Sequence, residues 1–141
     1  MKSKISFSKL NLRVTPIREE MITLLMNHQG VALSEPEINQ MFNHQPDRVS
    51  IYRTIRTLLD KMVIHKVICE DGVLKYALSP KANSEHPHFE CTSCGKVLCL
   101  NQHGVNSVDV PAGYTAQAIH MLIKGLCPNC VQVFGLNAGG I

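Results

Sequence analysis

Two C-x-x-C motifs, Cys91-Thr-Ser-Cys94 and Cys127-Pro-Asn-Cys130, constrain this chain more than any other feature. Each motif forms a tight turn that directs two thiolates at one point. Two such turns supply the four soft ligands of a closed, structural zinc site. The 32 residues between the motifs, residues 95–126, exceed what a compact zinc ribbon needs. Zinc bound to all four cysteines would therefore close a loop that contains strands of its own.

Redox chemistry and disulfide bonding are the alternatives for these cysteines. A redox C-x-x-C is expected within a thioredoxin-like βαβ unit, and no such pattern surrounds either motif. No signal peptide opens the sequence, so we expect its six cysteines to stay in the reducing cytoplasm, where thiols bind metal. No apolar run approaches the ~18 residues that span a bilayer, so we expect no membrane contact. A structural metal site is the favoured interpretation.

The positive charge is concentrated in the first half of the chain. Residues 1–75 contain eleven Lys and Arg against eight Asp and Glu, whereas residues 76–141 contain three of each kind. This distribution fits a first half that contacts nucleic acid. The arm at residues 1–12 carries Lys2, Lys4 and Lys9. We interpret it as a frayed terminus in preference to a DNA-contacting arm.

Capping signals and apolar spacing predict three helices in the first half. Thr15-Pro16 combines an N-cap residue with proline at the first helical position, and the helix it opens should end by Gly30. Ser34-Glu35-Pro36-Glu37 has the spacing of a capping box and begins a short second helix. Apolar residues at helical spacing predict a third helix over about residues 49–62.

The second and third helices have the order of a helix-turn-helix, with a turn at residues 43–47. In that geometry the later helix enters the major groove, and its outer face here carries Tyr52, Arg53, Arg56 and Thr57. Arginines can reach phosphates or guanine edges, and a tyrosine can pack on a thymine methyl. A merely solvated helix face is the alternative.

A predicted hairpin follows the third helix. Two β-like runs, residues 63–69 and 73–78, flank the turn signal Asp71-Gly72. A hairpin this small must pack on other elements, so residues 1–78 are predicted to form one winged helix. Residues 79–85 are polar, contain proline and lack periodicity, and are therefore interpreted as a linker.

The second half is predicted to contain three strands and a short terminal helix. The strands are expected at residues 89–91, 97–100 and 114–123, and the helix at residues 131–136. The third strand is apolar on both faces, which predicts burial on both sides. A domain of roughly 55 residues has a small core, so metal binding and dimerisation are expected to supplement it.

Four motifs, in this order, resemble those of the ferric uptake regulator family of metal-dependent bacterial repressors. They are Thr15-Pro16-Ile17-Arg18, Ile51-Tyr52-Arg53, His86-x-His88-x-x-Cys91-x-x-Cys94-Gly95-Lys96-Val97 and Gly125-x-Cys127-x-x-Cys130.

This resemblance implies an α+β fold: a winged-helix DNA-binding domain (residues 1–80), a hinge (81–88) and a small α/β dimerisation domain (89–141). It also implies a cytoplasmic homodimer with a structural zinc on the four cysteines. The predicted DNA contacts are Arg18, Ser50, Tyr52, Arg53 and Arg56. Dimer symmetry predicts a palindromic operator on double-stranded DNA. We expect a repressor of metal-uptake genes, with no enzymatic activity and no small-molecule substrate.

The regulatory metal site departs from the pattern that the resemblance implies. The hinge histidines, His86 and His88, are present. Where the family often has a histidine before the second helix, this chain has Ala32, with His28 upstream. Ala77 replaces a frequent acidic ligand in the wing, and Cys99 replaces another. His120 stands one residue out of the usual spacing, which would turn it to the opposite face of a strand.

We hypothesise a regulatory site of His86, His88 and Cys99, with His65, Cys69 or His103 as candidates for a fourth ligand. A thiolate with imidazoles favours Zn(II) over Fe(II) or Mn(II) as the second, regulatory metal. Cys99 could instead be a small buried hydrophobic residue. Two further hypotheses stay open: a peroxide or thiol sensor of the same family, and a DNA-binding scaffold that has lost its regulatory site.

Overall fold

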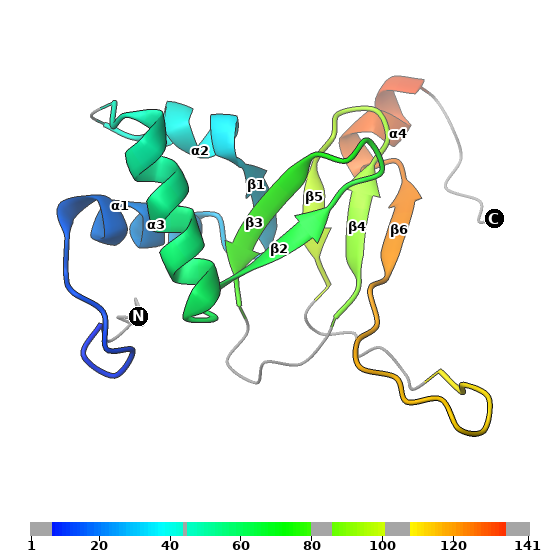
Figure 1. The fold of residues 1–141 in the computed structure, drawn as a ribbon. Coiled ribbons are helices and arrows are strands. Elements are labelled where there is room, and N and C mark those ends of the chain that lie inside the picture. Colours follow the sequence, from blue (N-terminus) through cyan, green and yellow to red (C-terminus); the bar gives the residue numbers. More distant parts are fainter. Residues whose placement is uncertain (1–6, 44, 80–85, 101–107, 135–141) are drawn as a thin grey trace.

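A computed structural model describes residues 7–43, 45–79, 86–100 and 108–134. Its strands form one six-stranded sheet in the order β2-β3-β1-β5-β4-β6. Three helices lie at one end of this sheet and a short helix at the other (Figure 1). The elements are α1 (Pro16–Asn27), β1 (Val31–Ser34), α2 (Glu35–Met41), α3 (Arg48–Asp60), β2 (Ile64–Ile68), β3 (Leu74–Leu78), β4 (His88–Cys91), β5 (Val97–Cys99), β6 (Leu122–Gly125) and α4 (Pro128–Phe134). The predicted α+β fold class is confirmed.

The predicted helix starts are confirmed by their caps. The Thr15 hydroxyl accepts a hydrogen bond from the Arg18 backbone N–H at 3.4 Å, and the Ser34 hydroxyl accepts one from Glu37 at 3.3 Å. Each cap satisfies an amide that has no partner inside its helix. The three helices then bury a common apolar core, whose fully buried members include Met21, Leu25, Ile38, Ile51 and Leu58.

The predicted wing is also present. β2 and β3 pair antiparallel, with Lys66 opposite Tyr76. Gly72 takes a φ of +85° at the turn, which glycine adopts without strain, and Asp71 accepts a hydrogen bond from the Val73 N–H at 3.0 Å. The turn signal Asp71-Gly72 therefore marks the tip of the wing.

The frayed arm is a wrong prediction for residues 7–12. Phe7, Leu10 and Leu12 pack against the core of the three helices, because three apolar side chains within six residues can cover its edge. Lys9 is exposed on this segment. Lys2 and Lys4 lie outside the described residues.

Strand β1 is missing from the sequence-based prediction. It has only four residues, between the end of α1 and the Ser34 cap, so no alternation pattern could develop. Nevertheless β1 occupies the centre of the sheet, because it pairs with β3 on one edge and with β5 on the other. It thereby joins the strands of the wing to those of the second half of the chain.

In the second half, the long strand predicted at residues 114–123 is wrong. The strand there is β6, which covers only Leu122–Gly125 and pairs parallel with β4. The chain before β6 projects from the body of the protein (Figure 1), and Tyr114 is 72% exposed. Its apolar composition does not reflect burial within one subunit. The terminal helix α4 begins at Pro128, earlier than the predicted residue 131. None of the described helices is both long and apolar enough to cross a membrane.

Candidate metal centres and nucleic-acid interface

The two C-x-x-C motifs converge. The four sulfur atoms of Cys91, Cys94, Cys127 and Cys130 lie within 4.8 Å of one another, and those of Cys94 and Cys127 are 3.8 Å apart. The parallel pairing of β4 with β6 brings the motifs together, because it sets Cys91 opposite Gly125. A side chain at Gly125 would approach the Phe89 ring to 3.2 Å, so glycine permits this close pairing of the strands.

The cysteine turns also stabilise thiolates. Hydrogen bonds from the backbone N–H groups of Cys94 and Cys127 lower the pKa of Cys91 to about 6. The Cys127 N–H lies 3.3 Å from the Cys91 sulfur. The pKa of Cys127 is lowered as well, chiefly by the backbone N–H of Cys130. A hydrogen bond with Ser93 lowers the pKa of Cys130, but the Cys127 side chain and burial outweigh it and raise that pKa to about 12, so this thiol would lose its proton on binding a metal. Four convergent sulfur donors suit a tetrahedral Zn(II) and leave no coordination position for water, as in a structural site.

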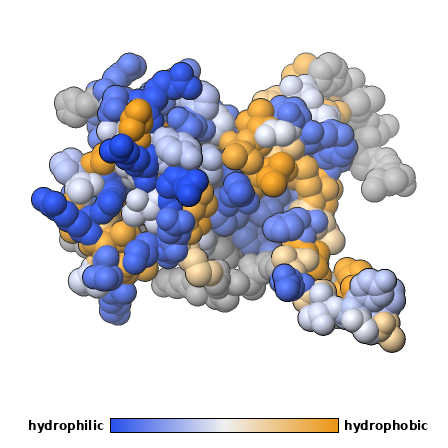
Figure 2. Space-filling view, viewed as in Figure 1, coloured by the Kyte–Doolittle hydropathy of each residue, from blue (hydrophilic) through white to orange (hydrophobic). Residues whose placement is uncertain are grey.

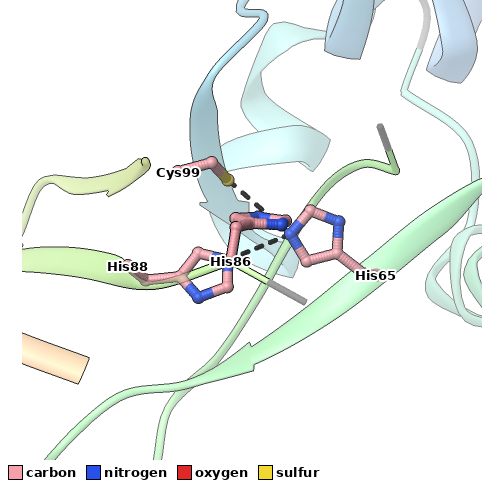
Figure 3. A group of neighbouring side chains, drawn as sticks. All are labelled: His65, His86, His88 and Cys99. Carbon is pink, nitrogen blue, oxygen red and sulfur yellow. Dashed lines mark hydrogen bonds between the residues drawn. The ribbon is translucent and has the colours of Figure 1, made fainter. Parts of the chain in front are cut away.

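A second cluster combines three histidines and a cysteine (Figure 3). His65 lies in β2, His86 precedes β4, and His88 and Cys99 are the first residue of β4 and the last residue of β5. The ligand atoms lie within 4.8 Å of one another. The His65 Nε2 atom is 3.1 Å from His88 Nε2 and 3.6 Å from the Cys99 sulfur. Because His88 and Cys99 are directly opposite in the β4–β5 ladder, the sheet fixes half of the cluster.

Burial sets the protonation of this cluster. It lowers the pKa of His65 and of His88 to about 4, and the neighbouring His86 adds to both shifts. These two imidazoles are therefore neutral at pH 7 and can offer a lone pair to a metal ion. Burial raises the pKa of the Cys99 thiol to about 11, so this ligand must lose a proton when it binds a metal.

The structure brings His86, His88 and Cys99 together as predicted, and it adds His65 among the three candidates for a fourth ligand. Cys69 belongs to a separate group with Asp71, at the tip of the wing, and Glu90 of β4. Asp71 accepts the Val73 N–H within the turn, and Glu90 accepts the Glu70 N–H, so both carboxylates already have backbone partners. His103 lies outside the described residues. Neither His28 nor His120 is part of the cluster.

The predicted recognition helix, α3, exposes its polar face. Tyr52 is 52% exposed, and Arg53 beside it is exposed as well. The Arg56 guanidinium donates a hydrogen bond to the Tyr52 hydroxyl at 3.3 Å and lies 5.9 Å from the centre of its ring. Ser50 accepts a hydrogen bond from Thr54 through its carbonyl. Hydrophilic residues dominate the surface over the three helices (Figure 2).

Arg18 lies on a different helix, α1, where its guanidinium donates a hydrogen bond to the Arg13 carbonyl at 2.8 Å. This bond holds the charged group near the start of α1.

The order of these elements and sites matches a known family. A family model described as "Ferric uptake regulator family" matches residues 9–121, which is most of the chain. The chain belongs to the ferric uptake regulator family. Proteins of this family are DNA-binding transcription regulators, which agrees with the expectation that the chain is not an enzyme.

Proteins similar to this chain have names that refer to different metals. The chain is 27% identical to the ferric uptake regulation protein of Bacillus subtilis (strain 168) over 89 residues, which cover 60% of each chain. It is 24% identical to the zinc uptake regulation protein of Escherichia coli (strain K12) over 129 residues, 87% of this chain and 75% of that one. A solved zinc uptake regulator complexed with zinc and DNA has the same fold, with a TM-score of 0.62 and 22% identity, covering 92% of this chain and 90% of that chain.

Proposed function

We propose that this chain is a metal-responsive, DNA-binding transcriptional repressor that acts as a homodimer, and that zinc is its co-repressor. The observation that carries the proposal is the cluster of His65, His86, His88 and Cys99. It takes one side chain from the wing and three from beyond the linker. A metal bound to all four would tie the DNA-binding half to the second half.

The donor atoms favour zinc over iron or manganese. The cluster offers three imidazole nitrogens and one sulfur, and among the described residues no carboxylate belongs to it. Fe(II) and Mn(II) sites commonly include carboxylate oxygen, whereas a thiolate with imidazoles suits Zn(II). The chain is similar both to a ferric and to a zinc uptake regulation protein, so the donor atoms alone carry this choice of metal. We assign a second, structural zinc to the four cysteines.

Regulation follows from linkage. A metal that binds one arrangement of the wing and the second half better than others shifts the population toward that arrangement. If that arrangement presents α3 to DNA, zinc raises the affinity for the operator. Tyr52, Arg53 and Arg56 would make contacts in the major groove, supported by Ser50 and Arg18.

The apolar chain before β6 supports dimerisation. Val108, Val110 and Tyr114 are exposed by 60%, 44% and 72% in the single subunit. Large apolar side chains exposed along one segment are typical of a protein interaction surface. A symmetric dimer would place two copies of α3 on successive major grooves, so we expect a palindromic operator.

The proposal is tested by counting zinc in the purified protein and measuring binding to an operator selected from random DNA. We expect two zinc ions per chain, of which mild chelation removes one and abolishes DNA binding. The variant Cys99→Ser should retain one zinc and bind DNA weakly at all zinc concentrations. One tightly held zinc, with DNA binding indifferent to chelation, would instead support a scaffold without a regulatory site.

Burial argues against the peroxide- or thiol-sensing alternative. A thiolate reacts with peroxide far faster than a thiol. The pKa of Cys99 is raised to about 11, and the pKa of Cys69 is also raised, chiefly by burial and by the Glu90 charge. Both side chains are therefore protonated thiols at neutral pH in the metal-free protein. Loss of DNA binding on peroxide treatment of the zinc-loaded protein would favour the alternative.

A further inference from the structure

The sheet continues without interruption from the wing into the cysteine-bearing half. Leu33 of β1 pairs with Tyr76 of β3, and Ala32 of β1 pairs with Val97 of β5. Beside this second pair, the Cys99 N–H donates a hydrogen bond to the Gly30 carbonyl at 2.7 Å. Backbone hydrogen bonding thus crosses from one half to the other through β1 (Figure 1).

A small apolar cluster covers this crossing. We call it the seam, and it consists of Ala32, Val67, Cys69, Ala77 and Val97. Ala32 and Ala77 are 1% and 2% exposed, and Val97 is fully buried. The two alanines occupy the positions at which the related pattern often has metal ligands. A histidine or carboxylate there would overfill the seam or be buried without a partner.

A buried charge connects the two halves a second time. The Lys75 ammonium of β3 donates a hydrogen bond to the Gly95 carbonyl at 2.7 Å and pairs with the Glu37 carboxylate at 3.3 Å. Glu37 lies in the first turn of α2, and Gly95 follows Cys94 in the first cysteine turn. The Lys75 side chain is only 11% exposed, so its ammonium and the bond to Gly95 are shielded from solvent, whereas the Glu37 side chain is 42% exposed. Lys75 therefore links the helix-turn-helix directly to the cysteine site.

We propose that the seam and Lys75 dock the winged helix onto the cysteine-bearing half independently of the histidine cluster, with Lys75 as the residue that positions α2 against the cysteine turn. The five seam residues and Lys75 do not belong to the histidine cluster, and Cys99 alone is shared, because it packs against the seam as well. Metal binding at that cluster then adjusts two halves that are already docked. This inference stands whether or not the histidine cluster binds zinc.

Hydrogen exchange of single amides, followed by NMR in the zinc-loaded homodimer, tests the proposal. The Cys99 amide reports on the crossing between β1 and β5. The Val63 amide, bonded to the Leu58 carbonyl, reports on the winged helix, and the Cys91 amide, bonded to the Lys96 carbonyl, reports on the cysteine-bearing half. The last two show whether each half remains folded in a variant.

The variants Val97→Ala, which leaves a cavity in the seam, and Lys75→Met should speed exchange of the Cys99 amide by at least about tenfold, with the two reporter amides unchanged. Lys66→Met is the matched control, because Lys66 is an exposed lysine of the same hairpin, and it should have no effect. His65→Ala, which disables the histidine cluster, should change exchange of the Cys99 amide by less than about threefold.

Two results would overturn the proposal. One is unchanged exchange of the Cys99 amide in Lys75→Met and Val97→Ala while both halves stay folded. The other is an acceleration in His65→Ala as large as that in Val97→Ala, which would show that the cluster holds the halves together. If Val97→Ala fails to fold, the comparison of Lys75→Met with Lys66→Met decides.

Discussion

Replacing His65 with alanine tests whether the wing supplies a ligand to the proposed regulatory site. Among the four residues of the cluster, His65 alone comes from the wing. Its Nε2 atom approaches both His88 and Cys99, and its Nδ1 atom is buried without a hydrogen-bond partner among the described residues. A bound metal would therefore lose one of four donors in the variant.

The magnitude follows from known metal sites and from linkage. Loss of a residue that only orients a ligand weakens metal affinity by roughly 10- to 100-fold, so loss of the ligand itself should cost at least about 100-fold. At free zinc of about 100 times the wild-type Kd, binding stabilises the wild type by about 2.7 kcal/mol, but the variant by only about 0.4 kcal/mol. For a chain of 141 residues these gains correspond to increases in Tm of about 9 °C and about 1 °C.

Thermal unfolding in zinc-buffered solutions that keep the cysteine site loaded measures both increases. His120→Ala is the control, because His120 is an exposed histidine outside the cluster, and it should retain the wild-type increase. A zinc-dependent increase in His65→Ala within about 2 °C of the wild-type value would refute His65 as a ligand. An equal loss in both variants would show that the proposed ligand set is wrong.

Three other predictions follow from the same structure. Because the pKa of Cys99 is about 11, zinc binding at pH 8 should release one proton from its thiol. Titration calorimetry in two buffers of different ionisation enthalpy measures this release, and Cys99→Ser should abolish it. The metal-free cluster should lose stability as the pH falls from 6.5 toward 4. The pKa of His65 and of His88 is about 4 in the folded protein, so the unfolded chain binds more protons in that window. Urea unfolding should show that the free energy of unfolding is lower at pH 5 than at pH 7 by on the order of 2 kcal/mol, after allowance for partial exposure of the two histidines. The difference should be smaller in the variant in which both His65 and His88 are replaced by alanine. Arg53→Ala should weaken operator binding and lower the slope of log K against log salt by about 1, whereas Lys96→Ala, in the cysteine turn, should leave the slope unchanged.

Local signals made much of the fold predictable. Thr15 and Ser34 cap helices through contacts within three residues, and Asp71 and Gly72 form a turn whose geometry depends on their own chemistry. These structures depend only on residues that are neighbours in the sequence, so they can be predicted from the sequence. The C-x-x-C spacing is equally local, and it predicted a convergence that the pairing of β4 with β6 brings about.

Long-range pairing was not predictable in the same way. β1 is too short to show an alternating pattern, and its two partner strands are separated from it by about 40 to 65 residues. The sequence of residues 31–34 therefore does not predict a central strand. The choice of His65 over Cys69 depends on the register of the wing, which places His65 opposite Ala77 and toward the hinge. The apolar run at residues 114–123 misled for the opposite reason: it has the composition of a buried strand, but only its end pairs within the subunit.

Cys99 connects the proposed regulatory site to the DNA-binding helices. Its thiol faces His65 in the cluster, while its backbone N–H donates a hydrogen bond to the carbonyl of Gly30, the residue before β1. β1 ends at Ser34, whose hydroxyl caps α2, and α2 packs on α3. A metal that fixes the Cys99 sulfur therefore restrains the strand from which the helix-turn-helix begins. Contiguity alone does not establish coupling. If the seam already docks the two halves, however, they move as one rigid body. A small restraint at Cys99 then changes the position of α3 without a large domain movement.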